Sequence, residues 1–146
     1  WQERPALMQR LFVDTSACFA FANRSDPEHK AVAALLAAYK GRLVTSNFVF
    51  DETVTLCLFR VGHAAAEKVG QALLDHGQVD LVRIAPEDET AAWQLFRDRR
   101  DQEYSFTDRT SFALMRRLGV GAAAALDDDF AREGFEQLPL QGPHAG

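Results

Sequence analysis

Residues 11–16 read Leu-Phe-Val-Asp-Thr-Ser, three apolar residues followed by one acidic and two hydroxyl residues. The apolar run suits a short buried strand, and Asp14 falls at its carboxyl end. Similar runs recur down the chain, and helix-like segments separate them. We therefore expect strands and helices to alternate along the whole sequence. The expected strands cover residues 11–13, 43–45, 79–84, 120–126 and, at the sheet edge, 135–140.

Helix start and stop signals frame the segments between these strands. Asp26-Pro27 predicts one helix start, and Thr107 is predicted to cap a later helix. Trp93 and Phe96 lie in an amphipathic segment, and we expect them in the core rather than stacked on nucleic-acid bases. The alternation predicts an α/β fold, a three-layer α/β/α sandwich around a central, mostly parallel sheet. The expected helices cover residues 27–40, 47–61, 64–76, 86–100 and 107–118.

Composition indicates an ordinary single domain. The 146 residues are 47% hydrophobic and 25% charged, and a chain of this length can bury a core without staples. Two cysteines cannot form a disulfide framework, and no apolar stretch reaches the ~20 residues of a membrane span. We expect a cytoplasmic protein without membrane contact. The net charge of −5 argues against a protein that coats nucleic acid through a basic surface.

One domain is expected to cover residues 1–146, with its core between about residues 10 and 140. Residues 1–7 precede Met8 and carry charges of both signs, so we expect added residues or a misplaced start. Residues 141–146 are expected to form a loose tail.

Acidic residues fall where a parallel sheet binds its ligands, at the carboxyl ends of its strands. Asp14 follows the first strand and Asp127 follows the fourth. Glu52 lies one turn into the helix after the second strand, and Asp108 lies in the first turn of a later helix. Each has an ordinary alternative: Asp14 could cap a helix, Glu52 could be an exposed helical charge, and Asp108 could complement a helix dipole.

Four carboxylates at one edge would repel one another, by roughly 4 kcal/mol for two charges about 4 Å apart at an effective dielectric near 20. Hard divalent cations relieve such crowding. Oxygen ligands without a nearby His or Cys pair favour Mg²⁺, with Mn²⁺ as a substitute. The chemistry that fits is metal-assisted hydrolysis of a phosphodiester.

Four segments, in order, resemble the PIN domain family of nucleases, which includes the VapC-type toxins of toxin–antitoxin pairs. They span residues 11–138, nearly the whole chain. One departure is Ala125, where the family often has a hydroxyl residue. The segments are Val13-Asp14-Thr15-Ser16-Ala17, Asp51-Glu52-Thr53, Tyr104-Ser105-Phe106-Thr107-Asp108-Arg109-Thr110-Ser111-Phe112-Ala113, and Ala124-Ala125-Leu126-Asp127-Asp128-Asp129-Phe130 followed by Gly134-Phe135.

The resemblance implies a catalytic, Mg²⁺-binding site in a ribonuclease that prefers single strands. Its residues would be Asp14, Glu52, Asp108 and Asp127, with Asp129 as a possible outer ligand that reaches the ion through water. The resemblance also implies an RNA substrate, a homodimer, and a cognate antitoxin that covers the acidic groove in a type II toxin–antitoxin pair.

Hydroxyl and basic residues beside the carboxylates are candidates for substrate contact. Ser105, Thr107 and Thr15 could orient a carboxylate or a scissile phosphate, although helix capping and turn formation also explain them. Arg109, next to Asp108, is the best candidate for binding phosphate. The neighbouring arginines that could line the same groove are Arg97, Arg99 and Arg100.

Other classes of protein share part of this pattern. Aspartyl-phosphate phosphatases and receiver domains also place an Asp at a strand end. The phosphatases of the haloacid-dehalogenase type need a second Asp two residues later, where this chain has Ser16. Receivers need a Lys after a late strand, where this chain has acidic residues. A PIN-like binding module without catalysis is the non-enzymatic alternative, and the four filled acidic positions disfavour it.

Overall fold

The computed structural model describes residues 9–139, so the predictions for residues 1–7, residue 140 and the tail at 141–146 lie outside the described residues. A five-stranded sheet forms the centre, with the strand order β3-β2-β1-β4-β5. All neighbouring strands are parallel. The predicted parallel sheet is therefore confirmed. The strands are β1 Arg10–Val13, β2 Arg42–Ser46, β3 Val79–Val82, β4 Ala122–Ala124 and β5 Glu136–Leu138.

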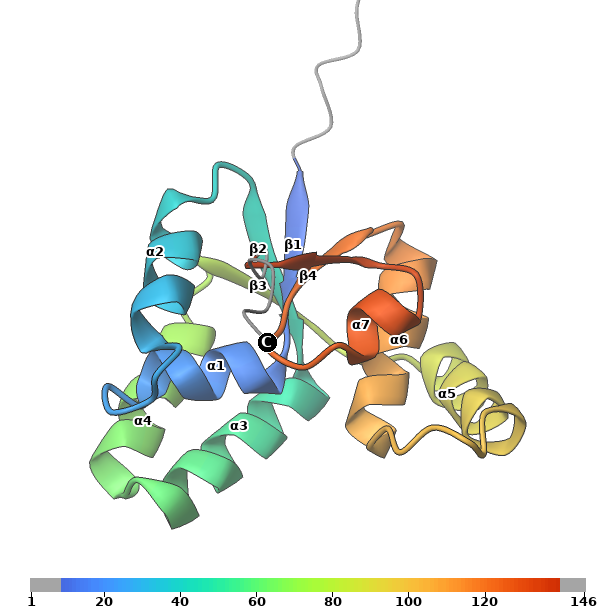
Figure 1. Cartoon of the computed structure of the whole chain (residues 1–146), viewed down its shortest axis with the longest axis horizontal. Helices are drawn as coiled ribbons and strands as arrows, with labels where there is room; N and C mark the ends of the chain where they lie inside the picture. The colour runs from blue at the N-terminus through green and yellow to red at the C-terminus, as the bar shows by residue number, and fades with distance from the viewer. Residues whose placement is uncertain (1–8, 140–146) are drawn as a thin grey trace, which may run out of the picture.

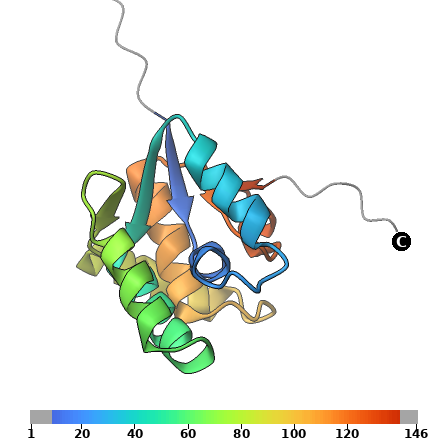
Figure 2. The ribbon, with the colours of Figure 1, turned by 90° about the vertical axis from the view of Figure 1, so that its left-hand side faces the viewer.

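Helices cover both faces of the sheet and complete the predicted three-layer sandwich. Helices α1 to α4 lie on one side, and α5 to α7 lie on the other (Figure 1). Seen from the first side, α6 lies behind the strands (Figure 2). The helices are α1 Thr15–Ala22, α2 His29–Ala38, α3 Asn47–Arg60, α4 His63–Leu73, α5 Pro86–Asp98, α6 Phe106–Leu118 and α7 Asp129–Arg132.

The order of the strands reverses between β1 and β4. The chain runs outward from β1 through β2 to β3, and then returns through α5 and α6 to place β4 on the other side of β1. Val13 at the end of β1 lies beside Ala124 at the end of β4. Such a reversal opens a crevice at the carboxyl ends of the two strands, and ligands of open α/β sheets bind there.

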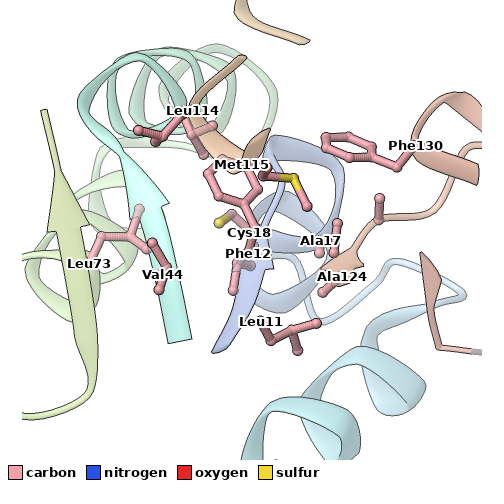
Figure 3. Packing of buried hydrophobic residues seen from close by; sticks show 14 of the residues in the cluster. Leu11, Phe12, Ala17, Cys18, Val44, Leu73, Leu114, Met115, Ala124 and Phe130 are labelled. Carbon is pink, nitrogen blue, oxygen red and sulfur yellow. The ribbon is translucent and has the colours of Figure 1, made fainter. Parts of the chain in front are cut away.

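The core packs large side chains from β1 and the helices against small residues of β4. Phe12 and Phe130 are fully buried, and so are Ala123 and Ala124 (Figure 3). Phe112 meets the Phe130 ring edge to face, with the ring centroids 4.9 Å apart. The small side chains let β4 lie in the middle of the sheet. This packing fixes the carboxyl ends of β1 and β4.

Several element boundaries differ from the predicted ones. The helix expected from Asp26-Pro27 begins at His29, because the Asp26 side chain first accepts a 2.8 Å hydrogen bond from the Glu28 N–H and closes a turn. The short helices α1 and α7 have no predicted counterpart, and β4 is shorter than the expected strand at 120–126. The predicted end of the helix at residue 118 is confirmed, since Gly119 follows it with the left-handed φ of 70°.

The expectation that Trp93 and Phe96 lie in the core is wrong. Their exposed fractions are 54% and 46%, because both lie on the outer side of α5. Within residues 9–139, no helix is long and apolar enough to cross a bilayer.

Candidate active site

Asp14 lies at the carboxyl end of β1 and caps the N-terminus of α1. Only 3% of the residue is exposed. One carboxylate oxygen, Oδ2, accepts hydrogen bonds from the Ser16 N–H (3.2 Å) and the Ser16 hydroxyl (2.7 Å). The other oxygen, Oδ1, is buried with no hydrogen-bond partner among the described residues. A buried oxygen of this kind is costly unless a ligand satisfies it.

The pKa of Asp14 is raised to about 7, chiefly by burial and in addition by the charges of Asp108 and Asp127. The hydrogen bonds from Ser16 act in the opposite direction, since they favour the charged form. The helix-cap alternative for Asp14 is therefore confirmed, and its role in a site stays a prediction. Its electrostatic neighbours are the two carboxylates that the sequence pattern placed at the same edge.

Ser16 joins the ends of the two central strands. Its hydroxyl donates to Asp14 and accepts a 3.1 Å hydrogen bond from the Leu126 N–H. Leu126 immediately precedes Asp127. One side chain therefore connects the loop after β1 with the loop after β4, and so positions both acidic residues.

Asp108 lies in the first turn of α6 and takes part in a capping box. The Ser105 hydroxyl accepts a 3.0 Å hydrogen bond from the Asp108 N–H, and Asp108 Oδ2 accepts one of 3.2 Å from the Ser105 N–H. The prediction that Thr107 caps this helix is wrong, because the helix begins one residue earlier and Ser105 is its cap. Burial raises the pKa of Asp108 to about 6, with further contributions from Asp127 and other carboxylates.

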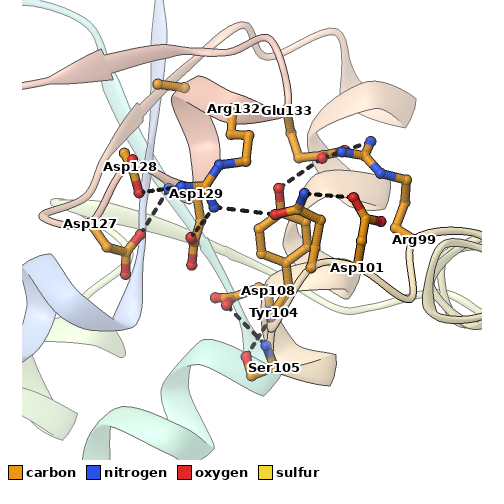
Figure 4. Close-up of polar contacts among 12 residues, drawn as sticks. Arg99, Asp101, Tyr104, Ser105, Asp108, Asp127, Asp128, Asp129, Arg132 and Glu133 are labelled. Carbon is orange, nitrogen blue, oxygen red and sulfur yellow. Dashed lines mark hydrogen bonds and ion pairs between the residues drawn. The ribbon is translucent and has the colours of Figure 1, made fainter.

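Glu52 and Asp129 also lie within electrostatic reach of Asp108, since both raise its pKa. Glu52 is half-buried on α3. Asp127 is exposed in the loop after β4, and its carboxylate accepts a 3.3 Å hydrogen bond from the Asp129 N–H (Figure 4). Asp128 points to solvent and pairs with Arg132. The fold therefore brings Asp14, Glu52, Asp108 and Asp127 to one edge of the sheet.

The chemical character of this edge fits a hard divalent cation. The donors are carboxylate oxygens, and the orphaned Oδ1 of Asp14 offers a lone pair without a proton donor. As the side chains stand in residues 9–139, no three His, Cys, Asp or Glu residues form a ready metal cage. The carboxylates therefore influence one another's pKa values, but their oxygens do not yet surround a common point at metal–ligand distance.

Arg109 does not point to a substrate groove. It is 3% exposed, and its guanidinium donates to the backbone carbonyls of Arg99 (3.3 Å), Gln102 (3.0 Å) and Tyr104. The guanidinium also lies 5.0 Å from the centre of the Phe96 ring. Its donors hold the loop between α5 and α6, so the sequence-based role in phosphate binding is not supported by the structure.

Thr107 and Thr15, both predicted to contact substrate, differ in their hydrogen bonds. The Thr107 carbonyl accepts hydrogen bonds from the hydroxyls of Thr110 (2.7 Å) and Ser111 (3.0 Å). Thr15 follows Asp14 and is buried, and its hydroxyl has no partner among the described residues. Thr15 therefore keeps a free hydrogen-bonding group beside the site.

Sequence reasoning missed Glu133. Its side chain is 2% exposed and accepts hydrogen bonds from the Tyr104 hydroxyl (2.9 Å) and Arg99 (2.9 Å; Figure 4). It also accepts one from Arg116 (3.3 Å). This carboxylate ties α7 and the Asp127 loop to the segment that leads into Asp108. No local pattern signals the role, because its partners lie 17 to 34 residues away in the chain.

The structure is thus a parallel α/β/α sandwich with a cluster of carboxylates at its switch point, as the sequence motifs predicted. Residues 11–136 match the model of the PIN domain family. The chain belongs to this family, as its sequence motifs indicated. This match rules out the two alternative classes, aspartyl-phosphate phosphatases and receiver domains.

Named relatives support the assignment. The chain is 38% identical over 128 residues to the 23S rRNA-specific endonuclease VapC20 of Mycobacterium tuberculosis, covering 88% of this chain and 97% of that protein. It is 28% identical over 111 residues to a VapC ribonuclease of Archaeoglobus fulgidus, covering 73% and 70% of the two chains.

Solved structures agree in fold. The crystal structure of M. tuberculosis VapC20, described as a sarcin–ricin loop cleaving toxin, matches with a TM-score of 0.82 over 86% of this chain and 95% of that chain, at 38% identity. VapBC2 from Rickettsia felis, bound to a DNA fragment from its promoter, matches with a TM-score of 0.65 over 88% and 97% at 9% identity, which shows the fold alone.

Proposed function

We propose that this chain is a divalent-metal-dependent endoribonuclease and the toxin of a toxin–antitoxin pair. The observation that carries the proposal is the pairing of Asp14 and Asp108 at the switch point. Both are carboxylates whose pKa is raised by burial, and the charge of Asp108 raises the pKa of Asp14. Proteins rarely retain such a pair unless a cation neutralises it.

Asp14 and Asp108 are the principal ligands in this proposal, with Glu52 and Asp127 completing the site and Asp129 acting through water. Mg²⁺ is the proposed ion and Mn²⁺ its substitute. A bound ion supplies Lewis acidity at a phosphoryl oxygen and lowers the pKa of a water molecule. The residues of the chain would hold the ion and orient the scissile phosphate. Ser16, Ser105 and Glu133 keep the carboxylates in place.

The proposed substrate is the sarcin–ricin loop of 23S rRNA. The support comes from the VapC20 relative, whose name and structure specify that target and which matches nearly the whole of this chain. A net charge of −5 fits a nuclease that meets its RNA through bound cations and a few local bases rather than a broadly basic surface.

The test is cleavage of a synthetic sarcin–ricin hairpin, with the ends mapped, by the wild type and by paired variants. We expect cleavage with Mg²⁺ or Mn²⁺, none with EDTA, and at least a hundredfold loss in Asp14→Asn and Asp108→Asn. Asp127→Asn should lose activity, whereas Asp128→Asn, whose side chain is 77% exposed, should keep it. Full activity in Asp14→Asn and Asp108→Asn would overturn the site. RNA binding without cleavage under all conditions would indicate a binding module instead.

The proposal includes an antitoxin partner. Two adjoining apolar cavities of about 250 and 370 Å³ lie between α1, α2 and α4, and both are lined by Phe21, Ala33 and Val69. They suit an apolar segment of the antitoxin, while another segment would cover the acidic groove, since complexes of related fold are VapBC pairs. Co-expression with the product of a short neighbouring reading frame should yield a stable complex whose nuclease activity is suppressed. Phe21→Asp should prevent its formation.

A homodimer is also proposed. Leu58, Phe59 and Val61 are exposed at the end of α3, with Phe59 at 81%. Apolar side chains gathered in this way are typical of surfaces that a second protein covers. Light scattering should give a dimer mass for the wild type and a monomer mass for Phe59→Asp.

A further inference from the structure

The outer face of α5 carries an aromatic pair that the fold does not use for its core. The Trp93 and Phe96 rings are stacked, with their centroids 5.2 Å apart and their planes at 5°. About half of each residue is exposed. A parallel stack of this kind leaves a flat apolar surface in water, and flat aromatic surfaces are what unpaired nucleobases stack on.

The pair is linked by contacts to the helix that carries Asp108. The Arg109 guanidinium lies 5.0 Å from the centre of the Phe96 ring and 5.4 Å from that of Tyr104. Arg109 is itself fixed by the carbonyls of the loop between α5 and α6, and it directly follows Asp108 in α6. A continuous series of contacts therefore runs from the exposed Trp93 ring to the residue next to a proposed metal ligand.

Charges of both signs surround the pair, and the basic ones lie at the end of α5 that leads into the loop before Asp108. The first turn of α5 holds Glu87, Asp88 and Glu89, and its last turn holds Arg97 beside Asp98. Arg97 is four residues after Trp93 and therefore on the same face of the helix. Within the described part of the chain, neither Arg97 nor Arg100 forms an ion pair or a side-chain hydrogen bond.

Acidic side chains also occur near this end of α5. Asp98 accepts a hydrogen bond from Gln94 on another face of the helix, and Asp101 accepts one from Gln102 (Figure 4). Glu103 is exposed. The aromatic face is thus bordered by exposed Glu89, four residues before Trp93, at one end and by Arg97, four residues after it, at the end that leads toward Asp108.

We propose that Trp93 and Phe96 form a stacking subsite for an unpaired base of the RNA that flanks the scissile phosphate. Arg97 contacts the adjoining backbone phosphate. The inference rests on the proposed ribonuclease function and adds the surface that binds the single-stranded part of the substrate. It also gives the net acidic domain a local means of holding RNA without a broad basic surface.

Fluorescence of Trp93 measures this contact directly. The chain has two tryptophans, so Trp1→Phe leaves Trp93 as the only one. In EDTA, where cleavage is halted, a short single-stranded RNA should quench its emission in a saturable way, and an abasic oligonucleotide of equal charge should not. Absence of quenching by any RNA, including the sarcin–ricin hairpin, would overturn the subsite.

Kinetics of variants separate this role from a general structural one. Trp93→Ala should raise KM for the hairpin by about fivefold or more with kcat and Tm unchanged, as expected for loss of one stacked base. Trp93→Phe should recover most of the affinity, and Gln94→Ala on the same helix should match the wild type. An unchanged KM in Trp93→Ala with normal cleavage would overturn the stacking subsite without contradicting the proposed nuclease function. Conversion of a dimer to a monomer with unchanged KM would assign the pair to a protein interface and also overturn it.

Discussion

Ser16 donates a 2.7 Å hydrogen bond to Asp14, and the same hydroxyl accepts from the Leu126 N–H, so one serine sets the positions of two acidic loops. Residues that hold metal ligands in place commonly affect metal affinity by about ten- to a hundredfold. The Ser16–Asp14 bond also favours the charged carboxylate, which is the form that binds an ion.

Ser16→Ala should therefore raise the Mg²⁺ concentration for half-maximal cleavage by about tenfold. The effect should be largest near neutral pH, because loss of the hydrogen bond leaves the pKa of Asp14 even higher. Ser25→Ala, in the loop between α1 and α2, is the control and should behave as wild type. A titration of cleavage rate against Mg²⁺ checks this, and identical curves for all three proteins would contradict it.

Asp14→Asn should stabilise the metal-free protein at pH 8. The folded-state pKa of Asp14 is about 7, above the ordinary value of 3.8. Between these values the folded protein binds more protons than the unfolded chain, so the free energy of unfolding falls as pH rises from about 4 to 7. The variant avoids this loss and should gain roughly 4 kcal/mol at pH 8, or about 10 °C in Tm.

The same comparison at pH 4 provides the control, because both side chains are neutral there. Thermal unfolding in EDTA at the two pH values measures the effect. A variant that is less stable than wild type at pH 8 would show that the Asp14 carboxylate is satisfied within the protein and needs no cation.

Metal activation should depend on pH in a defined window. The pKa values of Asp14 and Asp108 are about 7 and about 6, so an ion must displace one proton below pH 7 and two below pH 6. Half-saturating Mg²⁺ should be constant above about pH 7.5, rise about tenfold per pH unit just below 7, and rise more steeply below 6. A half-saturating concentration that stays flat from pH 8 to 5.5 would exclude these two carboxylates as the principal ligands.

Arg109→Lys should destabilise the fold rather than weaken RNA binding. A lysine cannot reproduce the fork of donors that serves the carbonyls of Arg99, Gln102 and Tyr104. We expect a loss of about 2–4 kcal/mol in the free energy of unfolding, measured with urea. Arg97→Lys, exposed on α5, should change stability by less than about 0.5 kcal/mol. Normal stability with lost RNA affinity in Arg109→Lys would restore the role that the sequence suggested.

Much of the fold and the acidic edge could be predicted because local rules govern them. Apolar runs between helix signals mark the strands, and Asp14 and Asp127 follow two of these runs directly. The carboxyl ends of parallel strands lie at the same edge of the sheet, so residues that directly follow two such strands are expected to lie near each other.

The rest depends on contacts that spacing does not encode. The sequence suggests that Arg109 binds phosphate, but in the fold its guanidinium is used by the loop between α5 and α6. Trp93 reads as a core residue, yet α5 packs on α6 through its opposite face, where buried Asp88 forms a two-bond ion pair with Arg117. Ser105 rather than Thr107 caps α6. Both residues carry a hydroxyl group and they lie two positions apart, so the sequence alone does not say which one is the cap.

The most direct measurement of the central claim is an anomalous difference map from crystals soaked in Mn²⁺. We predict a peak at the carboxyl ends of β1 and β4, within bonding distance of Asp14 and Asp108 and absent from crystals of Asp14→Asn. An ion bound elsewhere, or no ion at millimolar Mn²⁺ and pH 8, would contradict the account.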